Sequence, residues 1–527
     1  MIQSPWLLVL LVGAAALWAR RARPAADAAD AAGDADAADA AAWSWRIDPL
    51  LAVVCGVVYG IAAAYVLAPH YVRAGDYGDV DFVSYCSSLG ASRDGTAAGY
   101  YRHHSALIGA LLGPVARSVG VLGALTGGSI VAGGVFASGL FLWGRIVAGR
   151  AAGVWTVVLA AACQQLLWIS RSPSFYPETT AACVLGTAGM AAALRWRTPS
   201  ALLWGGLGTG LIFTSDARFF TVGVWCAALL VLAVLSGDRT HILRRSAAAF
   251  LPVLAWWCVA RVVHDSVLHG ERATGVLVQS FGFVSDVQGY PRDAFNRDAL
   301  QYIDHVWGVT PLWSIPGALL GLVRISRLIP PSSGMEPEAL ELRTAYLLPW
   351  AVPVAAGALA AVAALWRRPW ALLAGLGLAV PYIANLMLVY RTLPHPRFAA
   401  MGMVIVPVIL GVGIGAVGGV RWARAPFVVR CVFLLGAVSG VIPGFLSPTA
   451  TWRLPICANN RVYDALARAT RTGVRLPRLD GDSQSEDSLG CQRALESDVA
   501  AGHTWIPFPD APDPADCHPD DAAAPPL

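Results

Sequence analysis

Runs of about 20 mostly apolar residues recur along most of the chain. A bilayer core about 30 Å thick is crossed by about 20 residues of α-helix, so each run predicts one transmembrane helix. About twelve spans are predicted, at residues 5–19, 48–68, 119–142, 151–169, 177–194, 200–214, 219–236, 246–263, 345–366, 369–390, 398–420 and 426–446. Because the 527 residues are 56% hydrophobic and only 14% charged, the pattern predicts an all-α, polytopic membrane protein and excludes an ordinary soluble one.

The arginine clusters predict how these helices are oriented. The chain has no lysine, and its arginines gather in alternate connections between the spans, at 20–23, 145–150, 195–197, 237–245, 366–369 and 421–424. Positively charged residues are retained on the cytoplasmic side, so these connections are predicted to lie inside. The three long segments 69–118, 264–344 and 447–527 then lie outside. We therefore expect a multi-pass protein of the bacterial cytoplasmic membrane whose functional loops face the periplasm or exterior.

This topology divides the chain into four predicted regions. Residues 1–23 are interpreted as a retained membrane anchor, because their arginines follow the apolar run; a cleaved signal peptide is the alternative. The Ala/Asp-rich residues 24–47 form a cytoplasmic linker with no core of its own. Residues 48–446 form the transmembrane domain, and residues 447–527 form a small external tail that is partly disordered.

An acidic stretch, RAGDYGDVDFVSYCSSLG, follows the second predicted span at residues 73–90. A helix is predicted to begin at Val80 and to stop at Gly90. Asp79 would then be its N-cap and Asp81 would lie in its first turn, where a carboxylate favours the helix dipole. Asp76 stands in a glycine-flanked turn. The three carboxylates are candidate catalytic groups, with helix capping and solvation as the alternative.

A second surface helix is predicted over residues 103–120, because its apolar run is too short to span before Pro114. It begins with His103 and His104. Adjacent side chains on a helix do not converge, so this pair is a poor metal signature. Hydrogen bonding to a substrate or exposure at the membrane interface is favoured. No cofactor is predicted, and a divalent metal is not indicated.

The arrangement resembles the GT-C class of membrane glycosyltransferases, specifically the protein O-mannosyltransferase and lipid A aminoarabinose transferase group, which uses polyprenyl-phosphate sugars. In that group an acidic pair opens the first external loop and a His-Pro-rich turn follows. The matching stretches here are GDVD at 78–81 and YYRHHSALIGALL at 100–112. Val80 and Ser105 depart from the family pattern. The resemblance implies a GT-C-like architecture and an inverting transfer of sugar to a lipid, glycan or protein acceptor.

Such a transfer needs a base for the acceptor hydroxyl and cations for the departing phosphate. Asp79 matches the leading aspartate of the family and is the first candidate for the base, followed by Asp81 and then Asp76. Arg218, in TSDARFF, and Arg397, in YRTLPHPRF, match its phosphate-binding cations, with Arg391 and His395 as weaker candidates. Anchoring at the membrane interface is the alternative role for each arginine.

Four of the ten cysteines, Cys86, Cys457, Cys491 and Cys517, fall in the predicted external segments, where disulfides persist. Four cysteines allow three pairings, and the sequence cannot choose among them. Cys457 with Cys491 is the least demanding pair. A bond from Cys86 to the tail would instead bring the tail over the first external loop.

Two other functions remain open. A transporter or flippase usually carries ionisable groups deep inside its spans, and these spans are nearly without them. A lipid-linked-glycan polymerase or ligase would also work on the outer face, although its functional arginines usually lie in a late loop. The chain has no aromatic-interleaved basic stripe, so nucleic acid is excluded as a partner. Membrane lipids, a lipid-phosphate sugar and its acceptor are the predicted partners.

Overall fold

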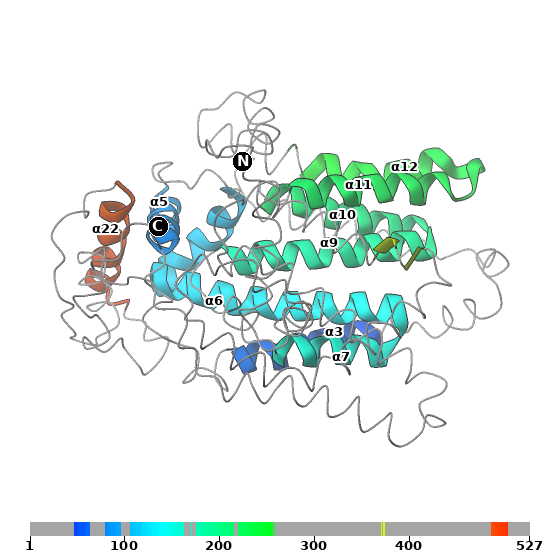
Figure 1. The fold of residues 1–527 in the computed structure, drawn as a ribbon. Coiled ribbons are helices and arrows are strands. Elements are labelled where there is room, and N and C mark those ends of the chain that lie inside the picture. The colour runs from blue at the N-terminus through cyan, green and yellow to red at the C-terminus, as the bar shows by residue number, and fades with distance from the viewer. Residues whose placement is uncertain are drawn as a thin grey trace, which may run out of the picture.

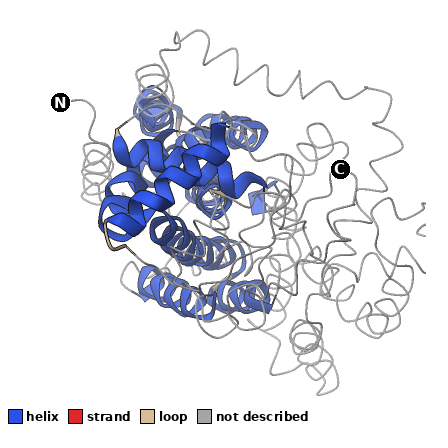
Figure 2. Cartoon of the chain, turned by 90° about the vertical axis from the view of Figure 1, so that its left-hand side faces the viewer, coloured by secondary structure: helices blue, strands red, loops and turns tan. Residues whose placement is uncertain are grey.

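The computed structural model describes residues 47–63, 80–95, 106–162, 170, 175–215, 220–256, 258, 370–371, 373–374 and 486–503. These residues form helices and short connections, and no strand occurs among them (Figure 2). The predicted all-α fold class is therefore confirmed for this part of the chain. The predicted spans 5–19, 345–366, 398–420 and 426–446 lie outside the described residues, so the count of twelve stays a prediction.

Seven helices lie side by side in a bundle (Figure 1). They are α3 (Ile47–Ile61), α6 (Ala106–Ala148), α7 (Arg150–Ala162), α9 (Tyr176–Trp196), α10 (Pro199–Ser215), α11 (Phe220–Leu235) and α12 (Ile242–Trp256). Six of the predicted spans coincide with α3, α7, α9, α10, α11 and α12, with ends that differ by up to seven residues. The span predicted at 119–142 is the second part of the longer helix α6.

Short connections join α6 to α7 and α9 to α10. Gly149, with φ 101°, separates α6 from α7, and its N–H donates to the carbonyl of Arg145. Arg197, with φ 52°, ends α9 in the left-handed conformation, and its N–H donates to the carbonyl of Ala193. Left-handed residues are common helix ends because they return an N–H to the last turn.

Small residues let these helices approach closely. Gly56 of α3 lies against Gly134 of α6, and Gly186 of α9 lies against Gly208 of α10. A Cβ at Gly56, Gly186 or Gly208 would come within 3.0 Å of the facing backbone. The Ser138 hydroxyl of α6 donates to the carbonyl of Ala52 in α3 at 2.9 Å. Small residues and interhelical hydrogen bonds are typical of helices packed within a membrane, where lipid supplies no hydrophobic driving force between them.

One described helix, Leu111–Ala148, is long and apolar enough to cross a bilayer. The helices Val222–Leu235 and Arg239–Trp256 pass the same test as a pair, although they meet at a bend of 118°. Ile47–Ile61 and Pro199–Phe213 are shorter apolar helices. The described part of the chain therefore contains one such helix, or two if the bent pair counts as one span.

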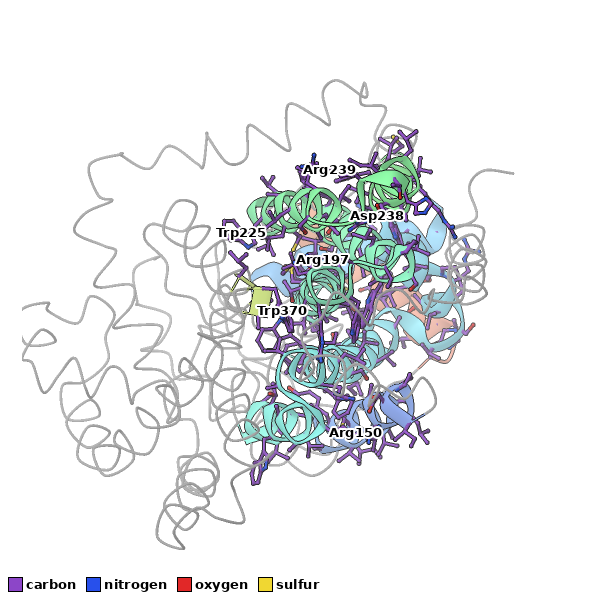
Figure 3. The ribbon with its side chains drawn as sticks, turned by 90° about the vertical axis from the view of Figure 1, so that its right-hand side faces the viewer. Arg150, Arg197, Trp225, Asp238, Arg239 and Trp370 are labelled. Carbon is purple, nitrogen blue, oxygen red and sulfur yellow. A yellow bond between two sulfur atoms is a disulfide. The ribbon has the colours of Figure 1, made fainter. Side chains whose placement is uncertain are left out.

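The described arginines of the inter-helix connections gather at one end of the bundle, which we call the arginine end (Arg145, Arg150, Arg195, Arg197, Arg239, Arg244 and Arg245). Figure 3 looks onto it and labels Arg150, Arg197 and Arg239 there. The fully buried Asp48 at the start of α3 pairs with Arg145 at 3.2 Å and with Arg150 at 2.5 Å. The Arg195 guanidinium lies 5.6 Å from the ring of Trp196 and 5.5 Å from that of Trp370. Charge and cation–π contacts therefore hold this end together.

Candidate active site

Most of the predicted site residues fall outside the described part of the chain. Asp81 is the exception, because its backbone lies in the first turn of α5 (Val80–Asp94). The others are Asp76, Asp79, His103, His104, Arg218, Arg391 and Arg397. The catalytic and binding roles of these residues stay predictions. The structure describes the helices that flank them.

Helix α5 begins at Val80, as predicted, so Asp79 directly precedes its first residue. The prediction that Gly90 stops this helix is wrong. The helix continues to Asp94, and Gly95 ends it with φ 75°. Gly90 instead faces Ala494, and a Cβ at Gly90 would come within 2.6 Å of the Ala494 side chain. The lack of a side chain at Gly90 therefore allows close packing against another helix. Rules for helix ends consider only neighbouring residues in the sequence, so they could not predict this role.

The predicted surface helix at 103–120 is the first part of α6. This part begins at Ala106 and ends where Gly120, with φ 79° and ψ 164°, interrupts the helix. It packs on α5: the Arg117 guanidinium Nε donates to the carbonyl of Arg93 at 2.8 Å, and Gly113 lies against the backbone of Ser92. The kink at Gly120 separates this part from the longer second part of α6.

A helix from the far end of the sequence covers α5. Helix α22 (Glu486–Ala500) packs on α5, and a disulfide joins Cys86 of α5 to Cys491 of α22. The least demanding pair, Cys457 with Cys491, is therefore wrong, and the alternative bond from Cys86 to the tail is present. Figure 1 shows α22 and α5 together at the end opposite the arginines, which we call the disulfide end. The pair Cys457–Cys491 was favoured because these two cysteines are closer in the sequence. The packing of α22 on α5 instead brings Cys491 next to Cys86.

A buried ion pair adds a second link between α22 and α5. Asp498 and Arg93 have side chains that are 3% and 8% exposed, and Asp498 Oδ1 accepts a hydrogen bond from Arg93 Nη1 at 2.5 Å. Asp498 Oδ2 accepts from the backbone N–H of Val121 at 2.6 Å. Burial raises the pKa of the Asp498 carboxyl, an effect that the Val121 N–H and the Arg93 charge oppose. These two partners therefore stabilise a charge that burial alone would disfavour.

Replacing both bridged cysteines, as Cys86→Ser/Cys491→Ser, is expected to weaken the docking of α22 on α5 by about 2–4 kcal/mol. The measurement is the melting temperature of the purified protein, with and without a reductant. We expect reductant to lower the melting temperature of the wild type and to leave that of the double variant unchanged. A non-reducing digest of the wild type should yield one peptide pair that links residues 86 and 491. Separate peptides for these two cysteines would contradict the assigned bond.

One functional candidate was missed by the sequence analysis. Glu178 lies in the first turn of α9, and both of its carboxylate oxygens are buried without a hydrogen-bond partner among the described residues. A Cβ at Gly128 of α6 would stand 3.2 Å from Glu178 Oε1, so the glycine leaves room beside the carboxylate. A buried carboxylate without a partner is costly, and such groups are retained mainly where they function. The sequence feature that could have indicated Glu178 is an acidic residue at the edge of a predicted span.

Helix α9 starts close to α5. Phe175 directly precedes α9, and its ring lies 4.9 Å from the ring of Tyr85 in α5, with both side chains fully buried. The turn that carries Glu178 and the helix that carries Asp81 are thus held together at the disulfide end. Figure 2 looks onto this end of the molecule. Among the described residues, no three His, Cys, Asp or Glu side chains gather closely enough to hold a metal ion.

No protein-family model matches the sequence, and no curated protein matches it. Solved structures do match. The oligosaccharyltransferase of Archaeoglobus fulgidus in its apo form has a TM-score of 0.51 and 15% identity, over 86% of this chain and 64% of that chain. The archaeal oligosaccharyltransferase from the same organism, in complex with an inhibitory peptide and a dolichol-phosphate, has a TM-score of 0.46 and 13% identity over the same shares.

The first of these similarities shows the fold. The chain shares the fold of this oligosaccharyltransferase and spans 64% of its length. The narrower resemblance to the protein O-mannosyltransferase and aminoarabinose transferase group is not tested by this similarity. At 15% identity the shared fold does not by itself carry over an activity or a substrate.

Proposed function

We propose that this protein is an integral membrane glycosyltransferase that moves a sugar from a polyprenyl-phosphate donor to a lipid, glycan or protein acceptor, with inversion at the anomeric carbon. The observation that carries the proposal is the position of α5. This helix begins directly after Asp79 and packs beside the start of α9, in a bundle with an oligosaccharyltransferase-like fold. The helix that follows Asp79 and the helix that carries the buried Glu178 therefore meet at one end of the bundle.

The proposed chemistry is a single displacement. The carboxylate of Asp79, or of Asp81, takes the proton of the acceptor hydroxyl while that oxygen bonds to the anomeric carbon. The bond from this carbon to the phosphate oxygen breaks, and the polyprenyl phosphate leaves with the electron pair. Arg218 and Arg397 stabilise the developing phosphate charge, with Arg391 as a further ligand, because guanidinium groups match phosphate oxygens. His103, His104 and Asp76 are assigned to substrate binding, and a divalent metal is not indicated.

We propose that the disulfide end faces the periplasm or exterior. Disulfides persist in oxidising compartments, and the Cys86–Cys491 bond lies at this end. The opposite end carries the arginines that the positive-inside rule assigns to the cytoplasm. Two independent features therefore support the same orientation. This orientation suits a donor that is consumed outside the cell, where nucleotide sugars are absent.

The experiment that tests the proposal uses purified full-length protein in proteoliposomes with decaprenyl-phosphate mannose and decaprenyl-phosphate arabinose, each radiolabelled in the sugar, and a cell-envelope extract as acceptor. We expect loss of label from one lipid, matched by release of decaprenyl phosphate. Movement of intact donor across the bilayer without release would instead indicate a flippase. A pyrophosphate-linked glycan donor is assayed in parallel, and turnover with this donor alone would indicate the polymerase or ligase alternative. Either result would overturn the proposal.

A further inference from the structure

Helix α22 contacts α5 at three levels along its length. Gly490 lies against Ser87, Cys491 is bonded to Cys86, and Ala494 faces Gly90. One turn further on, Asp498 pairs with Arg93 near the end of α5. These contacts follow one another along both helices. Helix α22 therefore holds α5 at several points, which fixes both its position and its rotation.

Asp498 extends this link to a third helix. Its second carboxylate oxygen accepts from the N–H of Val121, the first residue after the break at Gly120. The N–H groups at the start of a helix have no partner within that helix, and a carboxylate placed there satisfies one of them and favours the helix dipole. A residue 377 positions away in sequence thus caps the second part of α6. The same carboxylate contacts α5 and α6 at once.

Arg93 strengthens this junction from the side of α5. Its guanidinium donates to the carboxylate of Asp498 and to the carbonyl of Ala494, both in α22. It also donates to Asp94 Oδ1 at 2.8 Å, and this contact, followed by the charges of Asp498 and Asp94, raises the pKa of Arg93 despite its burial. The carbonyl of Arg93 accepts from Arg117 of the first part of α6. Apart from the bond to Asp94, which lies within α5, these contacts of Arg93 orient α5 relative to α22 and α6.

Helix α5 needs such support. It has 15 residues, and isolated helices of about 12–15 residues are marginal in water. It also lacks a strong apolar face, since SYCSSLGASRD supplies mainly small and polar side chains. Displacement of α5 would move its first turn, which carries Asp81 and follows Asp79. Misplacement of a reacting group by about 1 Å can cost about 100-fold in rate.

We propose that Asp498 is a positioning residue: through Arg93 and the Val121 N–H it holds α5, and with it the acidic motif, in the geometry required for transfer. The proposal rests on the proposed function, because it assigns a purpose to the position of α5. It gives the carboxyl-terminal tail a role in the reaction through the position of α5 and not through contact with the substrate by Asp498. The disulfide keeps α22 attached, and the ion pair determines where it sits.

The test compares Asp498→Asn with Glu496→Gln, a matched control that removes one negative charge from an exposed position of the same helix. Full-length protein in nanodiscs is analysed by hydrogen exchange and by the sugar-transfer assay. In Asp498→Asn we expect about tenfold faster exchange of the amides of residues 80–95 and of Val121, because one charge-assisted link is lost. The value of kcat should fall about tenfold with little change in the KM for donor. Glu496→Gln should match the wild type in both readouts.

Unchanged exchange at residues 80–95 in Asp498→Asn would overturn the proposal, whatever the activity. Faster exchange with unchanged kcat would overturn it as well, because α5 would then move without consequence for transfer. Asp498→Glu should restore part of the protection, which a purely steric role would not predict. If Asp498→Asn does not accumulate, Arg93→Gln tests the same link and leaves the Asp498–Val121 contact in place. Failure of the wild type to transfer sugar would instead reject the proposed function, and the exchange data would still show whether Asp498 holds α5.

Discussion

Asp79→Asn is expected to reduce sugar transfer by about 100- to 10,000-fold while the protein stays folded and inserted. The substitution separates the two roles open to this residue. Asparagine caps a helix about as well as aspartate, so α5, which begins at Val80, keeps its N-cap. The amide cannot take a proton from the acceptor hydroxyl. A loss of turnover without a change in melting temperature would therefore identify the carboxylate as the base and not only as a cap.

The companion variants rank the three aspartates. Asp81→Asn should lower kcat less than Asp79→Asn does, and Asp76→Asn should leave it within about threefold of the wild type, as expected for a solvated turn residue. Each variant is assayed with the donor that the wild type uses, and insertion is checked by protease protection of the tail. If both Asp79→Asn and Asp81→Asn transfer sugar as fast as the wild type, the assignment of the acidic motif to catalysis is wrong.

The apolar periodicity of the sequence predicted the bundle well, because each span is a local property of about 20 residues. Helices α9, α10 and α11 begin and end within two residues of their predicted spans. The prediction was less accurate for α12, which begins at Ile242 and not at residue 246, because its first turn follows the polar connection that contains Asp238. Asp238 accepts from the N–H of Thr240 and so caps the short 3₁₀ helix Arg239–His241, which runs directly into α12.

Contacts between distant segments could not be predicted in the same way. The Cys86–Cys491 bond joins residues 405 positions apart, and the partners of Asp498 lie on two other helices. In the local sequence pattern, Gly90 resembles a helix stop and Asp498 resembles a solvated tail residue. Their roles come from the surface of another helix. The candidate site is affected most by this limit, because α5, α9 and α22 meet there from separate parts of the chain.

Glu178 shows the same limit, since its position in the first turn of α9 predicts only a favourable charge at a helix N-terminus. The structure adds that neither carboxylate oxygen has a partner among the described residues. A group of this kind costs stability of about 1–3 kcal/mol. We therefore expect Glu178→Met, which keeps the length of the side chain and removes its polar atoms, to raise the melting temperature by about 2–4 °C.

The same variant should lower sugar transfer by about 100-fold or more, because a buried carboxylate without a partner among the described residues, in the first turn of α9, is available to bind or orient a cationic or hydroxyl group of the substrate. Glu496→Met, at an exposed position of α22, is the matched control and should change neither value. A lower melting temperature in Glu178→Met would mean that the carboxylate has a stabilising partner in the wild type, which would contradict the unpaired assignment. Unchanged transfer would remove Glu178 from the site. A more stable but inactive protein is the combination that a purely structural glutamate cannot produce, because only a functional group is retained against its own cost to stability.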